Sequence, residues 1–384
     1  MGPTNQPFRW IDQQSDVDEL VSELTASDAV GWDTEFHRER SYYPHLALVQ
    51  VAWPGGIALL DPLTLDLTPL AGVLAGAVSV LHASDQDITI LERACGEAPA
   101  VLFDTQVAAG FLGMSSPSLA SLVERFVGVR LPKGHRLADW SHRPLSEGEM
   151  RYAADDVAHL LQLHSVLTSR LEEKGRLAWA LAECQMLLQR DRSTQDPDTA
   201  WWRMKDSRAL RGDSRAVAQT VAAWRERRAE RLDIPPRFVL SDMALTNIAQ
   251  RKPTKAADLD GIRGLDRRQI GGASAELLEA VRAGLNLSAD ALRLPALDEG
   301  ERGQRAGVTL ASAWVAQLGR DIGIDPAILA TRADVVGFLR GSSSSRLANG
   351  WRAELVGEPV RRLVSGEAAL AFDGDNLVLE DRAK

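Results

Sequence analysis

The chain has 384 residues, enough for two or three domains, and its 45% hydrophobic and 25% charged residues are ordinary for a soluble globular protein. No apolar run is long enough to span a membrane, the N-terminus lacks the apolar core of a signal peptide, and the two cysteines, Cys95 and Cys184, are too few for a disulfide framework or a cysteine zinc site. The net charge of −9 is uneven, because residues 1–200 carry −13 whereas residues 201–284 carry 17 Lys+Arg and 11 Asp+Glu, net +6. We therefore expect a cytoplasmic protein with reduced thiols, an acidic first half and a basic module after it.

The first 185 residues alternate strand-like and helix-like patterns, which predicts an α/β domain over residues 1–189. Strands are expected near 29–35, 46–53, 56–61, 78–82 and 101–103, and helices near 67–75, 86–95, 104–112, 118–127 and 146–173. Short turns such as Trp53–Gly56 join the first three strands, so we expect these strands to form antiparallel hairpins.

Two polar segments divide the rest of the chain into helical modules. Residues 190–200 and 298–307 are charged and read as linkers, and the stretches between and after them, 201–288 and 308–373, have helical patterns. The polar tail, 374–384, is expected to be disordered. The basic first module is suited to phosphate contacts.

The stretch GWDTEF places two carboxylates, Asp33 and Glu35, two positions apart at the end of an apolar strand. A strand turns alternate residues to the same face, so the two side chains project side by side. Such a pair is costly when it is partly buried, and a divalent cation removes that cost. The alternative is a solvated strand end, and this stretch alone does not decide between the two.

A second acidic group follows the strand near 78–82, where the chain turns into a helix. The two candidates are Asp85 and Asp87. Carboxylates at such turns lie at the carboxyl edge of a sheet, where sites usually form in α/β proteins. Either residue could instead serve as a helix cap or first-turn acid, and Asp85 fits the cap better. The spacing favours Asp87 only weakly.

A third group lies on a helix that opens with a capping box, Ser146 followed by Glu149. Tyr152 and Asp156 are four residues apart and fall about 40° apart on one face of this helix. Asp155 is about 60° from Tyr152 on the other side and is also within reach. By itself, this pattern would suit a surface hydrogen bond between neighbouring turns.

Together, four carboxylates and a tyrosine from two strand ends and one helix are the expected ligands of two divalent cations. Two ions roughly 4 Å apart hold a phosphodiester and activate a water for in-line attack. Hard carboxylate oxygens favour Mg²⁺ or Mn²⁺.

Three motifs, WDTEF with the residues up to Ala52, HASDQD (82–87) and YAADD (152–156), resemble those of the DEDD family of 3′→5′ exonucleases, in its tyrosine subclass, and within it bacterial ribonuclease D. The flanking stretches 103–113 and 137–157 are also similar to the family, and the resemblance covers about residues 10–185. It implies a ribonuclease H-like α/β fold with a mixed sheet flanked by helices. The expected opening antiparallel strands agree with this fold.

The resemblance selects among the alternatives that spacing leaves open. It favours Asp87 over Asp85, because the second aspartate of the family lies five residues after the histidine matched by His82. It likewise favours Asp156 over Asp155.

The resemblance also implies a role for each residue of the set. Asp33 would bridge two metal ions, Glu35 and Asp156 would hold the ion that carries the attacking water, and Asp87 would help to position the second ion. Tyr152 would orient that water, since a tyrosine hydroxyl, with an ordinary pKa of about 10, is better suited to positioning than to removing a proton.

Two more residues match family positions near the terminal nucleotides of a substrate, His82 and Lys133. Lys133 would contact phosphate, although a solvated loop lysine is an equally good interpretation. Phe36 has a suitable chemistry for stacking on a base, but core packing is the more common fate of such a residue.

Residues 210–259 resemble an HRDC domain, and residues 309–341 and 346–372 resemble a second, more divergent one; both would be all-α. The combination predicts a metal-dependent 3′→5′ exoribonuclease that acts on RNA with a single-stranded 3′ end, such as a tRNA precursor, and releases nucleoside 5′-monophosphates. By family precedent we expect a monomer. A DNA exonuclease and a non-catalytic nucleic-acid-binding scaffold are the alternatives, and metal-dependent shortening of RNA would distinguish them.

Overall fold

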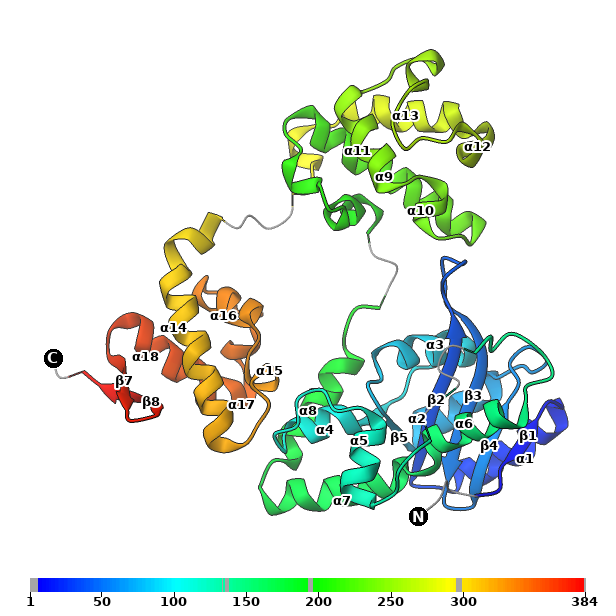
Figure 1. The fold of residues 1–384 in the computed structure, drawn as a ribbon, viewed down its shortest axis with the longest axis vertical. Coiled ribbons are helices and arrows are strands. Elements are labelled where there is room, and N and C mark those ends of the chain that lie inside the picture. The colour runs from blue at the N-terminus through cyan, green and yellow to red at the C-terminus, as the bar shows by residue number, and fades with distance from the viewer. Residues whose placement is uncertain (1–5, 133, 135–137, 193–195, 295–298, 383–384) are drawn as a thin grey trace. The chain divides into compact units, whose positions relative to one another are not determined.

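The computed structural model describes all residues of the chain except 1–5, 133, 135–137, 193–195, 295–298 and 383–384. The chain divides into two compact units (Figure 1). The first unit comprises Met1–Glu35, Leu46–Arg190 and Asp298–Lys384, and the second comprises Phe36–His45 and Asp191–Leu297. Among the described helices, none is both long and apolar enough to cross a membrane.

A six-stranded mixed sheet, in the order β1-β4-β3-β2-β5-β6, forms the centre of the first unit. Its strands are β1 (Arg9–Ile11), β2 (Ala29–His37), β3 (His45–Trp53), β4 (Gly56–Leu60), β5 (Val78–Leu81) and β6 (Val101–Asp104). Strands β3 and β4 pair antiparallel, as expected, whereas β1 with β4, β2 with β5, and β5 with β6 pair parallel. The predicted mixed sheet is confirmed. Only the three-residue β1 was not expected, because so short a strand leaves no pattern.

The helices of this domain lie close to their predicted positions, except that α1 and α8 were not predicted. They are α1 (Gln14–Thr25), α2 (Ala71–Gly76), α3 (Asp85–Cys95), α4 (Thr105–Gly110), α5 (Leu119–Leu122), α6 (Glu147–Ala158), α7 (Leu160–Glu173) and α8 (Leu177–Leu188), with short helical turns η1 (Thr68–Leu70) and η2 (Val123–Val127). The single helix expected over 146–173 is two helices, since the backbone leaves helical geometry at His159, with φ −113° and ψ 2°.

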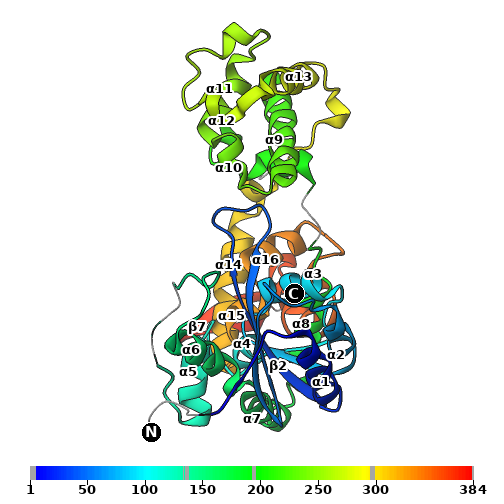
Figure 2. The same ribbon diagram turned by 90° about the vertical axis from the view of Figure 1, so that its right-hand side faces the viewer.

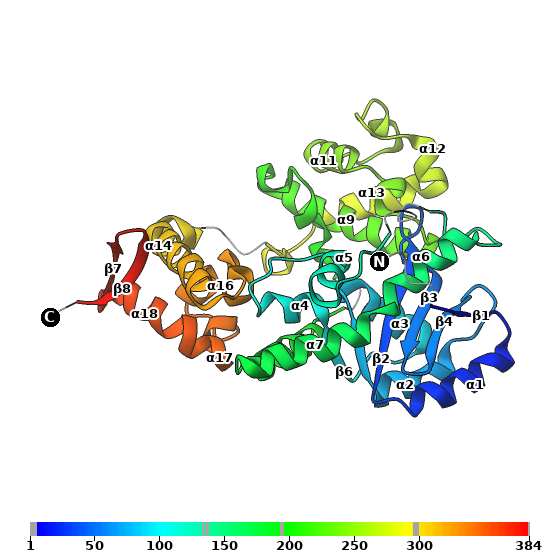
Figure 3. The ribbon, with the colours of Figure 1, turned by 60° about the horizontal axis from the view of Figure 1, so that its bottom comes forward.

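Helices cover both faces of the sheet (Figure 3). Val30 and Trp32 of β2 belong to the core that contains residues of α1, α2 and α3, whereas the core on the other face contains residues of α6 and α7. Gly31 faces α7 so closely that a Cβ atom there would lie 3.2 Å from Cβ of Leu160. Since side chains alternate along a strand, Asp33 and Glu35 share the face of Gly31, toward α6 and α7.

The C-terminal part of the first unit differs from its prediction at both ends. It contains α14 (Glu299–Ile322), α15 (Pro326–Leu329), α16 (Arg332–Leu339), η8 (Arg346–Ala348), α17 (Gly350–Arg352), η9 (Ala353–Gly357), α18 (Glu358–Ser365), β7 (Ala368–Asp373) and β8 (Asn376–Asp381). The expected linker over 298–307 is largely the polar start of α14, a helix in which Val308 is buried.

The expected disordered tail is instead strand β8, so this region is not all-α as predicted. Strands β7 and β8 pair antiparallel from Asp373 with Asn376 outwards. The two residues between them begin with Gly374 at φ +67°, a conformation that suits glycine in a tight hairpin turn. The alternation of apolar residues in NLVLE was the signal of a strand, and it was masked by the polar residues around it.

The C-terminal helices are attached to α8 through a buried charge cluster. Glu183 of α8 accepts hydrogen bonds from Arg346 at 2.8 Å and from Arg352 at 2.5 Å. Burial lowers the pKa of Arg352 to about 10, although the neighbouring Glu183 acts in the opposite direction. Beside this cluster, the rings of Trp179 and Trp351 stack with centroids 5.1 Å apart. These residues make the C-terminal region part of one unit with the sheet.

The second unit is helical over 201–284, as predicted. Its helices are η3 (Pro197–Arg203), η4 (Ser207–Ala209), α9 (Asp213–Leu232), α10 (Pro236–Val239), α11 (Asp242–Arg251), η5 (Ala256–Leu259), α12 (Arg267–Ile270), η6 (Gly271–Ala273), α13 (Ser274–Leu285) and η7 (Ala289–Ala291). The long helices α9 and α13 pack against each other, and α10 and α11 also contact α9 (Figure 2). Small residues allow this packing, since a Cβ atom at Gly284 would lie 2.5 Å from Cα of Val217.

Candidate active site

Three carboxylates meet where β2 faces α6. One carboxylate oxygen from each of Asp33, Glu35 and Asp156 lies within 4.8 Å of the others. The first two come from alternate positions of β2, and the third comes from the helix that covers the same face of the sheet. The spacing of the two acids in the sequence therefore produces the cluster only because α6 packs on that face.

The cluster is electrostatically unfavourable without a cation. Burial and the neighbouring carboxylates raise the pKa of Asp33 well above its usual value and raise the pKa of Glu35 to about 8. Burial, followed by the charge of Asp155, raises the pKa of Asp156 to about 7. Among the residues that the structure describes, no lysine or arginine forms an ion pair with these acids or with Asp87. Hard oxygen donors in this arrangement fit a divalent cation such as Mg²⁺ or Mn²⁺.

Asp87 lies in the first turn of α3, on the opposite layer of the domain from α6, and is only 9% exposed. Its Oδ1 accepts a hydrogen bond of 2.5 Å from the hydroxyl of Thr34, which lies between the two acids of β2. Burial raises the pKa of Asp87 to about 6, although the bond from Thr34 opposes the shift. The charge of Asp87 in turn raises the pKa of both Asp33 and Glu35, which places it beside the cluster.

Asp85, the competing acid of this turn, is exposed and forms an ion pair with Arg190 at 3.1 Å. The helix cap that the sequence assigned to Asp85 falls one residue earlier, on Ser84. Of the two acids, Asp87 is therefore the one whose charge acts on the carboxylate cluster.

Tyr152 lies one turn before Asp156 on α6, which opens with the predicted capping box of Ser146 and Glu149. A hydrogen bond from Tyr152 lowers the pKa of Asp156, against the stronger effect of burial. The ring of Tyr152 packs against the buried Trp140, with centroids 6.1 Å apart. This contact was not evident from the sequence, because Trp140 lies in an irregular segment before the helix.

Two residues, His82 and Lys133, were expected near the terminal nucleotides of a substrate, and the structure describes the first of them. The Nδ1 atom of His82 lies 2.9 Å from Oγ1 of Thr105, and that hydroxyl donates to the carbonyl of Leu81 at 3.1 Å. Burial lowers the pKa of His82, although the charge of Asp104 and a hydrogen bond with the backbone of Pro117 act in the opposite direction. Lys133 lies outside the described residues.

Helix α9, which belongs to the module expected to supply phosphate contacts, has most of its arginines paired with acids of its own unit. Arg228 and Arg231 each lie 3.4 Å from Glu276, and Arg227 lies 3.6 Å from Asp198. These five side chains line a cavity of about 360 Å³ between α9 and α13. Because its charges are close to balance, this cavity is a poor candidate for phosphate binding.

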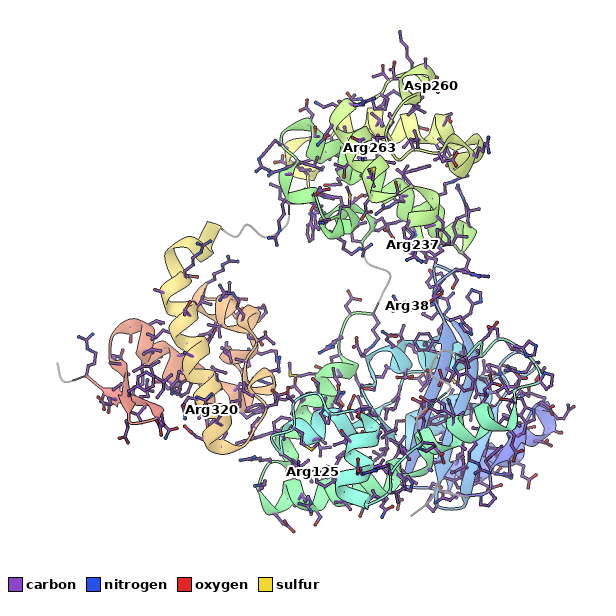
Figure 4. The ribbon with its side chains drawn as sticks, in the orientation of Figure 1. Arg38, Arg125, Arg237, Asp260, Arg263 and Arg320 are labelled. Atoms are coloured by element: carbon purple, nitrogen blue, oxygen red, sulfur yellow. The ribbon has the colours of Figure 1, made fainter. Side chains whose placement is uncertain are left out.

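Exposed charges of the second unit occur elsewhere on its surface. Figure 4 marks Arg237, Asp260 and Arg263, which are all exposed. Arg237 lies on α10, and the other two follow η5. The net positive charge of this unit is therefore carried by side chains distributed outside the cavity.

Known proteins and family models are similar to this chain over most of its length. The family model for 3′-5′ exonucleases matches residues 8–172, and the model for the HRDC domain matches residues 214–281. Ribonuclease D of Gluconacetobacter diazotrophicus is 36% identical over 377 residues, covering 95% of this chain and 94% of that protein. Ribonuclease D of Bartonella henselae is 33% identical, covering 94% of this chain and 91% of that protein.

A solved structure is also similar over nearly the full length. The crystal structure of Escherichia coli RNase D, described as an exoribonuclease involved in structured RNA processing, has a TM-score of 0.85 and 31% identity. The similarity covers 94% of this chain and 99% of that one. It therefore includes the helical second unit and the C-terminal helices in addition to the sheet.

Proposed function

The chain belongs to the ribonuclease D family and is a metal-dependent 3′→5′ exoribonuclease, and we propose how its carboxylates and tyrosine divide the work of phosphodiester hydrolysis. The observation that supports the proposal is the meeting of Asp33, Glu35 and Asp156 within 4.8 Å, with Asp87 beside them. In the reaction, a water oxygen forms a bond to the last phosphorus and the bond from phosphorus to the 3′ oxygen of the preceding nucleotide breaks. The products are a nucleoside 5′-monophosphate and a shortened RNA with a free 3′ hydroxyl.

Two divalent ions, Mg²⁺ or Mn²⁺, are the proposed cofactors. Asp33 would bridge both, Glu35 and Asp156 would complete the site of one, and Asp87 would serve the other. Bound ions supply positive charge that lowers the pKa of water and offsets the charge of the phosphodiester. The raised pKa values of the four carboxyls support this assignment. These groups lose their protons with difficulty when no cation is bound, and a bound cation would stabilise their charged form.

Tyr152 has a positioning role in this proposal. Its hydrogen bond with Asp156 and its contact with Trp140 hold the phenol next to the carboxylates, where the hydroxyl orients the attacking water. Thr34 holds Asp87 from the other layer. The middle residue of the Asp-Thr-Glu motif therefore also serves the site, although it points away from its two neighbours.

We propose RNA with a single-stranded 3′ end, including tRNA precursors, as the substrate, with His82 and Lys133 near its terminal nucleotides. The HRDC domain would add affinity through phosphate contacts without reading the sequence. Two buried free cysteines suit a reducing cytoplasm, which is the expected compartment, and the expected monomeric state stays a prediction.

The second, divergent HRDC-like domain also remains a proposal. Its support is a repeated order of elements. In the second unit the long α9 leads to the short, proline-initiated α10 and then to α11, capped by Ser241. In the first unit the long α14 leads to the short, proline-initiated α15 and then to α16, capped by Thr331.

The test uses a 5′-labelled single-stranded RNA with Mg²⁺ or Mn²⁺, resolved on a sequencing gel. A descending ladder is expected with metal and should disappear with excess chelator, in an Asp33→Ala/Glu35→Ala variant and in Asp87→Ala. Asp85→Ala is the matched control, because it removes an exposed acid from the same turn and should leave the ladder intact. Equal ladders on the matching DNA would indicate a general 3′→5′ exonuclease, and binding without shortening would leave only a scaffold.

A further inference from the structure

The carboxylate of Asp104, at the end of β6, connects two helix starts at the carboxyl edge of the sheet. It is 1% exposed and accepts five hydrogen bonds. Two come from the first turn of α4, from the N–H groups of Gln106 at 2.8 Å and Val107 at 3.2 Å. Three come from the turn between β5 and α3, from Ala83 N–H at 3.2 Å and from the N–H and hydroxyl of Ser84, both at 2.8 Å.

The turn between β5 and α3 depends on these bonds for its shape. Ala83 has φ +56°, a left-handed conformation that disfavours a residue with a side chain. Ser84 stands at the cap position of α3, yet its hydroxyl makes no bond to its own helix and donates to Asp104 instead. A local cap would stabilise α3 without fixing its direction, whereas a bond to β6 fixes the helix start relative to the sheet.

The first turn of α3 carries Asp87. Its side chain is held by Thr34 from β2, and the backbone that carries it is held by Asp104 from β6. Thr105, the next residue, holds His82 at the other end of the same turn. The position of Asp87 is thus determined by contacts from two different strands of the sheet.

We propose that Asp104 is a positioning residue for the metal site: it touches neither metal nor RNA, and it sets where Asp87 lies relative to Asp33 and Glu35. This inference rests on the proposed function. An asparagine has the same shape, but it offers one acceptor oxygen and one amide N–H₂ group to donors on both sides. The turn then shifts, and residues that orient metal ligands typically change metal affinity or activity 10- to 100-fold when they are replaced.

The test measures Mn²⁺ binding at pH 8 from the electron paramagnetic resonance signal of free Mn²⁺, together with kcat and KM on RNA. Asp104→Asn should bind Mn²⁺ about 10- to 100-fold more weakly and lower kcat, with KM for RNA nearly unchanged. Ser84→Ala removes one of the five bonds and keeps the charge of Asp104. The Mn²⁺ affinity of this variant should fall less, by about three- to tenfold. Because Asp104 keeps its charge in this variant, such a loss shows that the position of the turn affects the metal site independently of that charge.

Asp325→Asn is the matched control. Asp325 is 8% exposed and caps α15 by accepting from Ala327 N–H, so its replacement tests the same chemical change at a buried helix start elsewhere in the unit. It should leave Mn²⁺ affinity unchanged.

Unchanged Mn²⁺ affinity in Asp104→Asn would overturn the inference, and if that variant does not fold, unchanged affinity in Ser84→Ala would do so. A parent protein that binds no Mn²⁺ would overturn the proposed function as well, so the two failures are distinguishable.

Discussion

Replacing Asp33 by asparagine should stabilise the metal-free protein while it abolishes activity. Asp33 shares its cluster with Glu35 and Asp156, and burial and neighbouring carboxylates raise the pKa of all three, the neighbour of Asp156 being Asp155. Because these pKa values are higher in the folded state than in the unfolded state, folding takes up protons, and the free energy of unfolding of the metal-free protein falls as pH rises from about 4 to about 8. Asparagine keeps the shape of the side chain and removes one of the interacting charges.

The size of the effect follows from the geometry. Two charges at the upper limit of 4.8 Å, at an effective dielectric constant of about 20, repel by about 3.5 kcal/mol, and Asp33 takes part in two pairs that lie within this limit. Partial protonation relieves much of this cost, since the pKa of Glu35 is about 8 and that of Asp156 about 7. We therefore expect a gain of about 2 kcal/mol at pH 8, falling to almost nothing at pH 5, where the carboxyls of the parent are protonated.

Amide hydrogen exchange of peptides that span β2 and α6, measured with chelator present, gives the local opening free energy of this region. Asp61→Asn is the control. Asp61 is 3% exposed and paired with Arg143 at 2.7 Å, so its replacement should destabilise the protein at both pH values. A destabilised Asp33→Asn, or a gain of equal size at pH 5 and pH 8, would refute the electrostatic reasoning.

Three further predictions concern the metal, the tyrosine and the buried charge cluster. Because the raised pKa values keep protons on the four carboxyls, the Mn²⁺ concentration for half-maximal activity should rise at least about tenfold from pH 8 to pH 6, as measured by metal titration of the rate. Tyr152→Phe should lower kcat roughly 100-fold with little change in KM, and it should move the acidic limb of the pH–rate profile to higher pH, since the hydrogen bond that lowers the pKa of Asp156 is lost. Glu183→Gln removes the carboxylate that pairs with the buried Arg352, whereas Arg346 keeps its ion pair with Asp334 at 3.3 Å, and it should reduce the stability of the first unit by about 3–5 kcal/mol in denaturant unfolding.

Each of these has a result that would contradict it. A metal requirement independent of pH would mean that the carboxyls are already ionised at pH 6. A Tyr152→Phe profile that keeps its shape would remove the link to Asp156. For the charge cluster, Glu358→Ala breaks an exposed pair with Arg361 and should be nearly neutral, so equal losses in the two variants would contradict the role of burial.

The site was predictable to the extent that it follows from local periodicity. The alternation of β2 and the one-turn spacing of Tyr152 and Asp156 place those side chains correctly, and the capping box fixes where α6 begins. The spacing did not decide between Asp85 and Asp87, and only the family resemblance favoured Asp87, because the choice depends on which acid meets Thr34 across the sheet and which meets Arg190 at the surface. Such contacts depend on packing between elements, and no spacing within one element records them.

The C-terminal region was predicted less well for a related reason. The polar start of α14 and the apolar alternation of β8 acquire their structure from partners elsewhere in the chain, α14 by packing against α16 and β8 by pairing with β7. Composition alone therefore suggested a linker and a disordered tail.

The attachment of the C-terminal helices to α8 also has a consequence for synthesis on the ribosome. Glu183 is separated from Arg346 by 163 positions. Translation proceeds at about 5–20 residues per second, so the partners of α8 are synthesised roughly ten to thirty seconds after α8 itself. A message truncated in its second half would give a fragment that has all four carboxylates but leaves Glu183 and Trp179 uncovered. Such a fragment exposes an apolar ring and an unpaired carboxylate that the longer chain buries, which makes it prone to aggregation.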